Sequence, residues 1–434
     1  MNFSKPKPDT TQTYRAGWLL PISSPPIKDA RITVVGGVVA KVESFSANAG
    51  NASVIDLGNV AMMPRFVNAH THLEFSDCSE PIGAPGIALA DWIGEVIRAR
   101  GVSDETSRQA AIAKGVQESA DAGVGLIGDI ATTPSAYPDS IDPLIVSFAE
   151  VLGLSLDRHR ERLAGAATHH QALLVSSSVF SAISPHAPYS TPPDVIAECS
   201  RRANQHGVPL AIHLAESPDE RELLDHASGP FAASLRRAGV WREGIFPYTD
   251  DSIPSILETL APAPAVLLIH GNDLSEREIE IISQHRQMSV VYCPRTHHFF
   301  GHDRHPVADL LRSGVRVALG TDSRASNPDL SIWEEVRFLL QKRQDIDPQQ
   351  VLAMATLMGA EALMFGSPRA VSSRLQKRAI GQLVPGKTRF DSLLMVPTAG
   401  KQLDSVFADF SATETSQLKF CSANRPSDGH NTDN

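Results

Sequence analysis

Short apolar runs alternate with longer segments of helical periodicity from Val60 to about Phe365. This alternation predicts βα units around a parallel sheet, since each crossover between parallel strands needs room for a helix. We therefore expect an α/β protein with a (β/α)8, TIM-like barrel over residues 60–370. The eight apolar runs are VAMMPRFVNAH, GVGLIGDIA, LIVSFAEVLG, VFSAISPHAPY, VPLAIHLAES, AVLLIHGND, MSVVYCPRTH and VRVALGTDS.

The two ends of the chain have a different pattern. Residues 14–59 contain short β-type runs separated by Gly, Pro and Ser, and residues 376–398 add a further run that is too short to form a domain. We expect these two segments to form one small, discontinuous β-sandwich domain. Residues 1–13 and 399–434 are polar and lack periodicity, which predicts loosely ordered tails.

Composition narrows the class of protein. Hydrophobic residues make up 42% of the 434 residues and charged residues 20%, as in globular proteins. The 39 Lys and Arg against 49 Asp and Glu give a net charge of -10, which argues against a nucleic-acid partner. The four cysteines are widely scattered, which predicts free thiols. We find no pattern of a signal peptide and no apolar run close to the roughly 20 residues of a membrane span, so we expect a cytoplasmic protein.

Polar residues end several of the predicted strands, where (β/α)8 barrels carry catalytic side chains. His70 and His72 end the first strand and, being two residues apart, point in the same direction. Alone, this pair is equally compatible with two histidines bonded to the backbone. His213 ends the fifth strand and Asp322 the eighth, so closure of the barrel would gather three histidines and one carboxylate. This ligand set suits Zn²⁺ or Fe²⁺.

Three other residues border this predicted metal site. The fourth strand ends in SPHAPYS, which offers no Lys or carboxylate to bridge a second ion, so we expect one divalent metal ion per chain. His270 ends the sixth strand and is placed to hydrogen-bond metal-bound water. Glu216 is expected to act as general acid and base, or else is the first acidic residue of the next helix. His186 either contacts substrate or is a buried histidine bonded to the backbone.

Asp129 and Glu150 also end predicted strands of the barrel. Carboxylates at such positions often brace loops or ligand histidines. We expect that bracing role for both and place neither in contact with the reacting groups.

Several motifs occur in one order along the chain: PRFVNAHTHLEF, SPHAPYS, HLAES, IHGNDLS and LGTDSRASNPDLSIWEE. Through them the sequence resembles the metal-dependent amidohydrolase superfamily over most of its length, in particular the mononuclear aminohydrolases, which include S-adenosylhomocysteine deaminases, aminofutalosine deaminases and chlorotriazine hydrolases. The resemblance implies a catalytic site in which Glu216 protonates a ring nitrogen, His186 contacts substrate, and Asp322 and His270 relay the proton of water. It also implies that the metal ligands are His70, His72, His213 and Asp322.

The implied activity is hydrolytic deamination of an aminated heterocycle. The wording of HTHLEFS and SPHAPYS is most similar to aminofutalosine-deaminase-like members, which favours a 6-aminopurine nucleoside of the aminofutalosine, adenosine or S-adenosylhomocysteine type. Zinc is the first expectation for the metal and iron the second. The alternatives are displacement of chloride or alkylamine from a triazine-like ring, and an inactive barrel scaffold, against which the intact ligand set argues. The sequence leaves homo-oligomerisation open.

The sequence departs from the family pattern at two places. Arg65 replaces a usual glycine, and the seventh strand ends in CPRTHHFFGH where many relatives have CPxSN. Arg295 and His297 thus become candidate substrate-binding residues at the mouth of the barrel. A guanidinium group there binds a carboxylate, a phosphate or ribose hydroxyls, or forms an ion pair or helix cap within the protein.

Two glycine-rich matches are set aside. GQLVPGKT, residues 381–388, fits the P-loop expression but lacks the strand before it and the helix after it, so we expect a turn between strands. GVGLIG, residues 123–128, runs into a strand instead of leaving one, which is the wrong order for dinucleotide binding.

Overall fold

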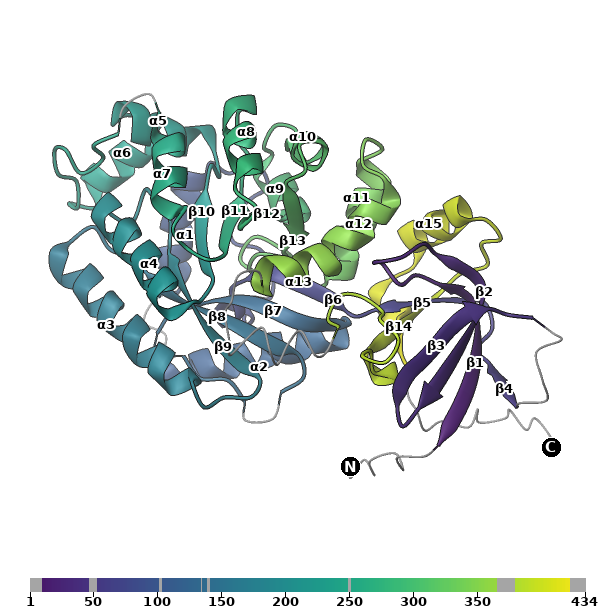
Figure 1. Ribbon diagram of the computed structural model, residues 1–434. Coiled ribbons are helices and arrows are strands. Elements are labelled where there is room, and N and C mark those ends of the chain that lie inside the picture. Colours follow the sequence, from purple (N-terminus) through teal and green to yellow (C-terminus); the bar gives the residue numbers. More distant parts are fainter. Residues whose placement is uncertain are drawn as a thin grey trace.

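Eight parallel strands form a barrel in the order β6 to β13, with helices around it (Figure 1). This confirms the expected (β/α)8 barrel, and each expected apolar run contains one of its strands. The computed structural model describes residues 10–46, 53–100, 104–133, 135–138, 141–248, 251–364 and 379–421. The barrel strands are β6 (Phe66–Thr71), β7 (Val124–Ala131), β8 (Leu144–Val151), β9 (Val179–Pro185), β10 (Leu210–Leu214), β11 (Val266–His270), β12 (Met288–Tyr292) and β13 (Arg316–Leu319).

Side-chain caps begin several of the surrounding helices. Ser217 accepts a hydrogen bond from the Glu220 amide in α5, and Ser275 and Glu278 form a capping box in α8. The helices are α1 (Leu89–Arg100), α2 (Glu105–Asp121), α3 (Leu156–Leu173), α4 (Pro193–His206), α5 (Pro218–His226), α6 (Gly229–Arg237), α7 (Ser252–Leu260), α8 (Glu276–Gln284), α9 (Pro294–Phe300), α10 (Val307–Arg312), α11 (Ile332–Lys342), α12 (Pro348–Met354), α13 (Leu357–Met364) and α15 (Leu403–Ala412). None of the helices in the described part of the chain has the length and apolar character needed to cross a membrane.

Hydrogen bonds join the ends of β6 and β13, the first and last strands of the barrel. The His70 carbonyl accepts the backbone N–H groups of Thr321 and Asp322, each at 3.1 Å. The Asn68 amide donates to the Thr321 hydroxyl at 2.8 Å. A Cβ at Gly320 would lie 2.8 Å from the His70 carbonyl oxygen, so a glycine permits this close approach. These contacts between the end of β6 and the segment after β13 therefore place Asp322 directly beside His70.

A second sheet is built from both ends of the chain. Its strand order is β15-β14-β5-β1-β2-β3, and β4 pairs with β1. Strand β5 pairs with β1 and β14, so residues 60–64 lie in this sheet, although the sequence placed the start of the barrel at residue 60. Residues 376–378 of the expected small domain lie outside the described residues. The strands are β1 (Thr11–Leu19), β2 (Ile27–Val35), β3 (Val38–Ser44), β4 (Val54–Asp56), β5 (Val60–Pro64), β14 (Leu393–Pro397) and β15 (Lys419–Phe420).

The C-terminal segment holds regular structure where a loose tail was expected. Helix α15 buries Val406, Phe407 and Phe410, and the Trp333 indole N–H of α11 donates to the Thr413 carbonyl at 2.7 Å. The prediction of a loosely ordered tail is therefore wrong for residues 403–420. Apolar residues at helical spacing in this segment form a face that packs on α11. Strand β1 likewise begins at Thr11, inside the expected N-terminal tail. Residues 1–9 and 422–434 lie outside the described part of the chain.

Helix α15 packs on the barrel through a stack of aromatic rings, and this contact should contribute to stability. The Phe66 and Trp333 ring centroids are 5.6 Å apart, and those of Trp333 and Phe410 are 5.3 Å apart. Phe410→Ala should lower the free energy of unfolding by about 3–5 kcal/mol, because it leaves a cavity in this stack. Urea unfolding measures the change. Phe420→Ala, at a site 42% exposed, is the control and should cost much less; equal losses would contradict the proposed support.

Candidate active site

Three histidine side chains converge at the carboxyl ends of β6 and β10. His70, His72 and His213 each offer one ligand atom, and these atoms lie within 4.8 Å of one another. Asp322, which follows β13, places Oδ1 3.5 Å from His70 Nε2 and 3.7 Å from His72 Nε2. The structure thus brings together all four residues that the sequence predicted as metal ligands.

The donor atoms of this cluster fit a metal ion. Among the described residues, neither buried ring nitrogen of His70 has a hydrogen-bond partner, which is costly unless another group binds it. His213 Nδ1 lies 2.7 Å from the His186 carbonyl oxygen and donates to it, so Nε2 keeps its lone pair for a ligand. Ser326 donates to Asp322 Oδ2 at 2.9 Å and leaves Oδ1 facing the histidines. Three nitrogens and one carboxylate oxygen are a common tetrahedral ligand set for zinc.

Burial also keeps these histidines in the form that binds metals. It is the largest cause that lowers the pKa of His70 and His72 well below their usual value and the pKa of His213 to about 4. The imidazoles are therefore neutral at pH 7 and have lone pairs to offer.

Two residues of the site have a strained backbone conformation that sets the direction of their side chains. His270 has φ +73° and Asp322 φ +58°, in the left-handed region that is unfavourable for residues with a Cβ. In β11, Leu267 and Ile269 belong to the apolar cluster inside the barrel, so simple alternation would point His270 outward. The left-handed conformation breaks the alternation and turns the imidazole toward the site.

Glu216 lies against His270, next to the cluster of three histidines and Asp322. Its Oε1 is 3.3 Å from His270 Nε2, and the Tyr189 hydroxyl donates to its Oε2 at 3.3 Å. Helix α5 begins after the cap residue Ser217, so Glu216 precedes the helix instead of lying in its first turn. Burial, with the charge of Asp322 beside it, raises the pKa of Glu216 well above its usual value. This shift favours the protonated form of the carboxyl group, which is the form that a general acid needs.

His186 lies on the more open side of the site. Its ring centroid is 4.9 Å from that of His213, and its Nδ1 bonds the Ser190 hydroxyl at 2.6 Å. The side chain is 23% exposed, compared with 13% for His72. It is therefore accessible to a ligand in a way that a fully buried histidine would not be.

The two acidic residues set aside from the sequence differ in their surroundings. Asp129 accepts the Leu73 amide at 2.9 Å, directly after His72, which is the bracing contact expected of it. Glu150 is buried, and its Oε1 lies 3.9 Å from His186 Nε2. Its position at the end of β8 was the signal that could have placed it in the site. Tyr189 was not predicted either, and no simple pattern in the sequence marks it.

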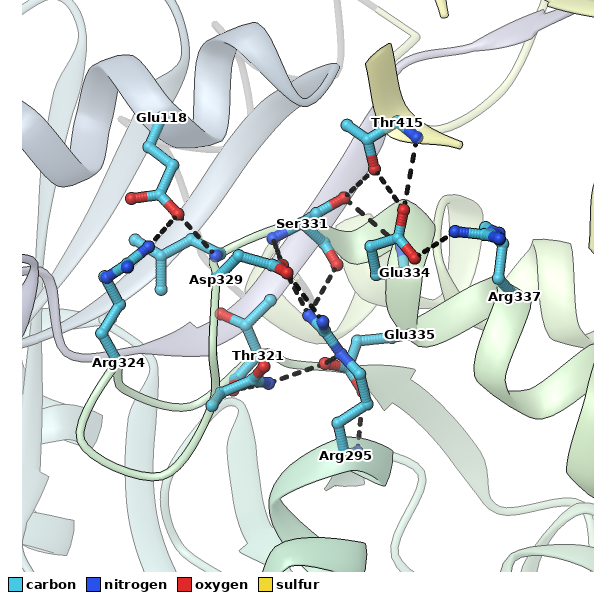
Figure 2. Close-up of polar contacts among 12 residues, drawn as sticks. Glu118, Arg295, Thr321, Arg324, Asp329, Ser331, Glu334, Glu335, Arg337 and Thr415 are labelled. Atoms are coloured by element: carbon cyan, nitrogen blue, oxygen red, sulfur yellow. Dashed lines mark hydrogen bonds and ion pairs between the residues drawn. The ribbon is translucent and has the colours of Figure 1, made fainter. Parts of the chain in front are cut away.

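Arg295 belongs to an ion-pair network, shown in Figure 2. Its Nη1 and Nη2 atoms donate to Asp329 at 2.9 and 2.7 Å, and its Nε donates to Glu335 at 2.7 Å. The side chain is only 14% exposed. These contacts support the ion-pair alternative and not the expected substrate contact, because the guanidinium donors are occupied within the protein.

The same network holds the segment before Asp322. Glu335 accepts a hydrogen bond from the Asn327 amide at 2.8 Å, and that amide also donates to the Thr321 carbonyl at 2.7 Å. Glu335 is fully buried. It therefore holds the loop that carries Asp322 through Asn327.

His297, the other candidate for substrate binding, lies in a group of aromatic rings. Its centroid is 5.7 Å from Tyr292 and 5.6 Å from His302, and burial lowers its pKa to about 4. Nearby His305, which the sequence did not single out, places its Nε2 2.8 Å from the His270 carbonyl oxygen. Contact of His297 with substrate stays a prediction.

Comparisons with known proteins agree on one family. The model of the amidohydrolase family matches residues 61–367. The 5-methylthioadenosine/S-adenosylhomocysteine deaminase of Nitratidesulfovibrio vulgaris (strain DP4) is 29% identical over 364 residues, which cover 78% of this chain and 75% of that protein. The aminodeoxyfutalosine deaminase of Deinococcus radiodurans is 29% identical over 360 residues, 76% of this chain and 82% of that one. A crystal structure of an adenosine deaminase from Xanthomonas campestris with bound zinc has a TM-score of 0.70 at 22% identity, covering 94% of this chain and 90% of that one.

The ion pairs of Arg295 predict a stability effect. Arg295→Gln should lower the free energy of unfolding by about 3–5 kcal/mol, because it leaves the buried carboxylate of Glu335 without its cation. Urea unfolding measures the loss. Arg389→Gln is the matched control: its pair with Asp391 is about half exposed and should be worth no more than about 1 kcal/mol. Wild-type stability in Arg295→Gln would show that the network is not structural.

Proposed function

Because the chain belongs to the amidohydrolase family, we propose that it is a metal-dependent aminohydrolase that releases ammonia from a 6-aminopurine nucleoside. The observation that carries the proposal is the carboxyl group of Glu216, held by His270 and Tyr189 beside the cluster of three histidines and Asp322. This arrangement combines groups for binding a metal with a proton donor. The deaminase relatives that act on adenosine-type compounds support the choice of substrate class.

One divalent ion per chain is proposed, zinc first and iron second. His70, His72, His213 and Asp322 would hold it, since their free donor atoms face one another. Such an ion lowers the pKa of water, so that hydroxide is available at neutral pH. The choice of zinc rests on the nitrogen-rich donor set.

The residues around the cluster supply the proton transfers. Glu216 donates its proton to the ring nitrogen next to the amino-bearing carbon, which makes that carbon more electrophilic as hydroxide adds to it. Asp322 and His270 accept one proton of water and pass it to the departing amino group. The bond from carbon to the amino nitrogen then breaks and ammonia leaves. The added hydroxyl returns its proton to the Glu216 carboxylate, so the oxygen stays on the ring as a carbonyl. His186 is the proposed contact for the rest of the substrate.

Release of ammonia tests the function directly. Purified protein with its metal content measured should contain about one zinc or iron per chain. It should release ammonia from at least one member of a panel of adenosine, 5-methylthioadenosine, S-adenosylhomocysteine and aminodeoxyfutalosine, with the matching change in ultraviolet absorbance. Cytosine, guanine and chloro- and aminotriazines are the comparison substrates. Turnover of a triazine alone would contradict the nucleoside assignment, and a chain that binds no metal would point to an inactive scaffold.

Two substitutions separate the proposed roles. Glu216→Gln should retain the metal but lose turnover by about 10²–10⁴-fold, because glutamine cannot donate the proton. His213→Ala should lose metal and turnover together, since it removes a ligand. Metal analysis and steady-state rates check both. Glu198→Gln on the outer helix α4 serves as the control for a charge change and should match the wild type. Normal turnover in Glu216→Gln would contradict the proposed acid.

A further inference from the structure

Glu150 faces His186 on the side of the site that is open to a ligand. Glu150 ends β8 and His186 follows β9, the neighbouring strand, and Glu150 Oε1 lies 3.9 Å from His186 Nε2. The His186 side chain is 23% exposed, whereas Glu150 is 8%, Glu216 6% and His270 3% exposed. A substrate whose reacting end lies at Glu216 and His270 therefore extends toward His186, and the buried Glu150 carboxylate lies beside that path.

His186 and Glu150 can each accept a hydrogen bond from a ligand. His186 Nδ1 lies 2.6 Å from the Ser190 hydroxyl oxygen, which also lies 3.2 Å from the Ala187 carbonyl oxygen. In the tautomer whose Nδ1 donates to Ser190, the second nitrogen, Nε2, is an acceptor, and the ionised Glu150 carboxylate offers only acceptors. In that form Nε2 and Oε1, 3.9 Å apart, do not satisfy each other. A group with two N–H or O–H donors would satisfy both.

The other neighbours of Glu150 leave it room for a ligand. Burial raises the pKa of Glu150, and the nearby charges of Arg100 and Arg162 act in the opposite direction. Arg100 itself binds the Glu74 carboxylate at 2.5 Å. Thr132 lies near Glu150, but its hydroxyl donates to Glu74 Oε1 at 2.9 Å. A carboxylate has about four lone-pair positions, so Glu150 keeps acceptor capacity for a ligand.

We propose that Glu150 and His186 together bind the two neighbouring hydroxyl groups of the substrate's ribose, which makes Glu150 a specificity-determining residue. This inference rests on the proposed function, because it takes a 6-aminopurine nucleoside as the substrate. With the ring nitrogen at Glu216, the sugar lies toward the exposed side of the site. One hydroxyl donates to each acceptor, so the diol bridges a pair of groups that the protein leaves unbridged. Glu150 thereby acquires a role other than the bracing role expected from the sequence.

The test compares three nucleosides on two forms of the metal-loaded enzyme. Adenosine, 2′-deoxyadenosine and 3′-deoxyadenosine are assayed with the wild type and with Glu150→Gln, and kcat/KM is followed by the absorbance change on deamination. In the wild type, removal of the hydroxyl that binds Glu150 should lower kcat/KM by about 10- to 100-fold, the range for a hydrogen bond to a charged group. Glu150→Gln should lower kcat/KM for adenosine by a similar factor. The variant should discriminate several-fold less between adenosine and the deoxynucleoside that lacks this hydroxyl, because the substitution and the loss of the hydroxyl remove the same interaction.

The outcomes separate this inference from the proposed function. A bracing role would lower all three rates equally and leave the discrimination unchanged, which would overturn the inference alone. If the wild-type enzyme has the same kcat/KM for all three nucleosides, the inference is wrong. This comparison needs only the wild type, so it holds even if Glu150→Gln does not fold. Ammonia from none of the three and from no other nucleoside of the panel would instead contradict the nucleoside assignment, and the inference with it. If only another panel nucleoside reacts, its own 2′- and 3′-deoxy forms replace those of adenosine in the same comparison. Glu198→Gln is again the matched control and should keep the wild-type discrimination.

Discussion

The two hydrogen bonds that the His70 carbonyl accepts from Thr321 and Asp322 are the interaction on which the site depends. They join the last strand of the barrel to the first, and so bring a carboxylate beside histidines that lie about 250 residues earlier in the chain. A barrel closes only when the tilt and register of its strands agree, so every strand contributes to the separation of these ligands. Gly320 serves the same closure, because a side chain there would collide with the His70 carbonyl.

The closed barrel holds an arrangement that is unfavourable by itself. Burial disfavours both a protonated histidine and a charged carboxylate, and the two nitrogens of His70 find no hydrogen bond among the residues described. Left-handed backbone at His270 and Asp322 adds strain. A cation bound at the cluster would use the lone pairs that are now unsatisfied, so metal binding and folding should be linked. Strain and desolvation at the same residues are typical of sites whose geometry serves function.

Sequence patterns predicted the metal cluster because strand ends and alternation are local, periodic features that barrel closure brings together. Arg295 could not be assigned in that way. Its partners Asp329 and Glu335 lie 34 and 40 residues further along the chain, and only the tertiary structure decides whether a strand-end arginine meets them or a ligand. Glu150 could be placed at a strand end from the sequence. The role of a carboxylate there depends on which side chains lie opposite it, and only the tertiary structure shows them. The helix around Phe410 was missed because its short apolar face is recognisable only against the surface it covers.

Helix α11 connects the C-terminal segment to the loop that carries Asp322. On it, Glu335 accepts from Asn327, which holds the backbone just before Asp322, while Trp333 bonds the Thr413 carbonyl and packs on Phe410. Both side chains are fully buried, so the helix cannot shift toward one set of contacts without disturbing the other. The C-terminal segment is therefore linked to the position of Asp322 through helix α11. This explains in physical terms why a helix outside the barrel belongs to the structure that positions the site.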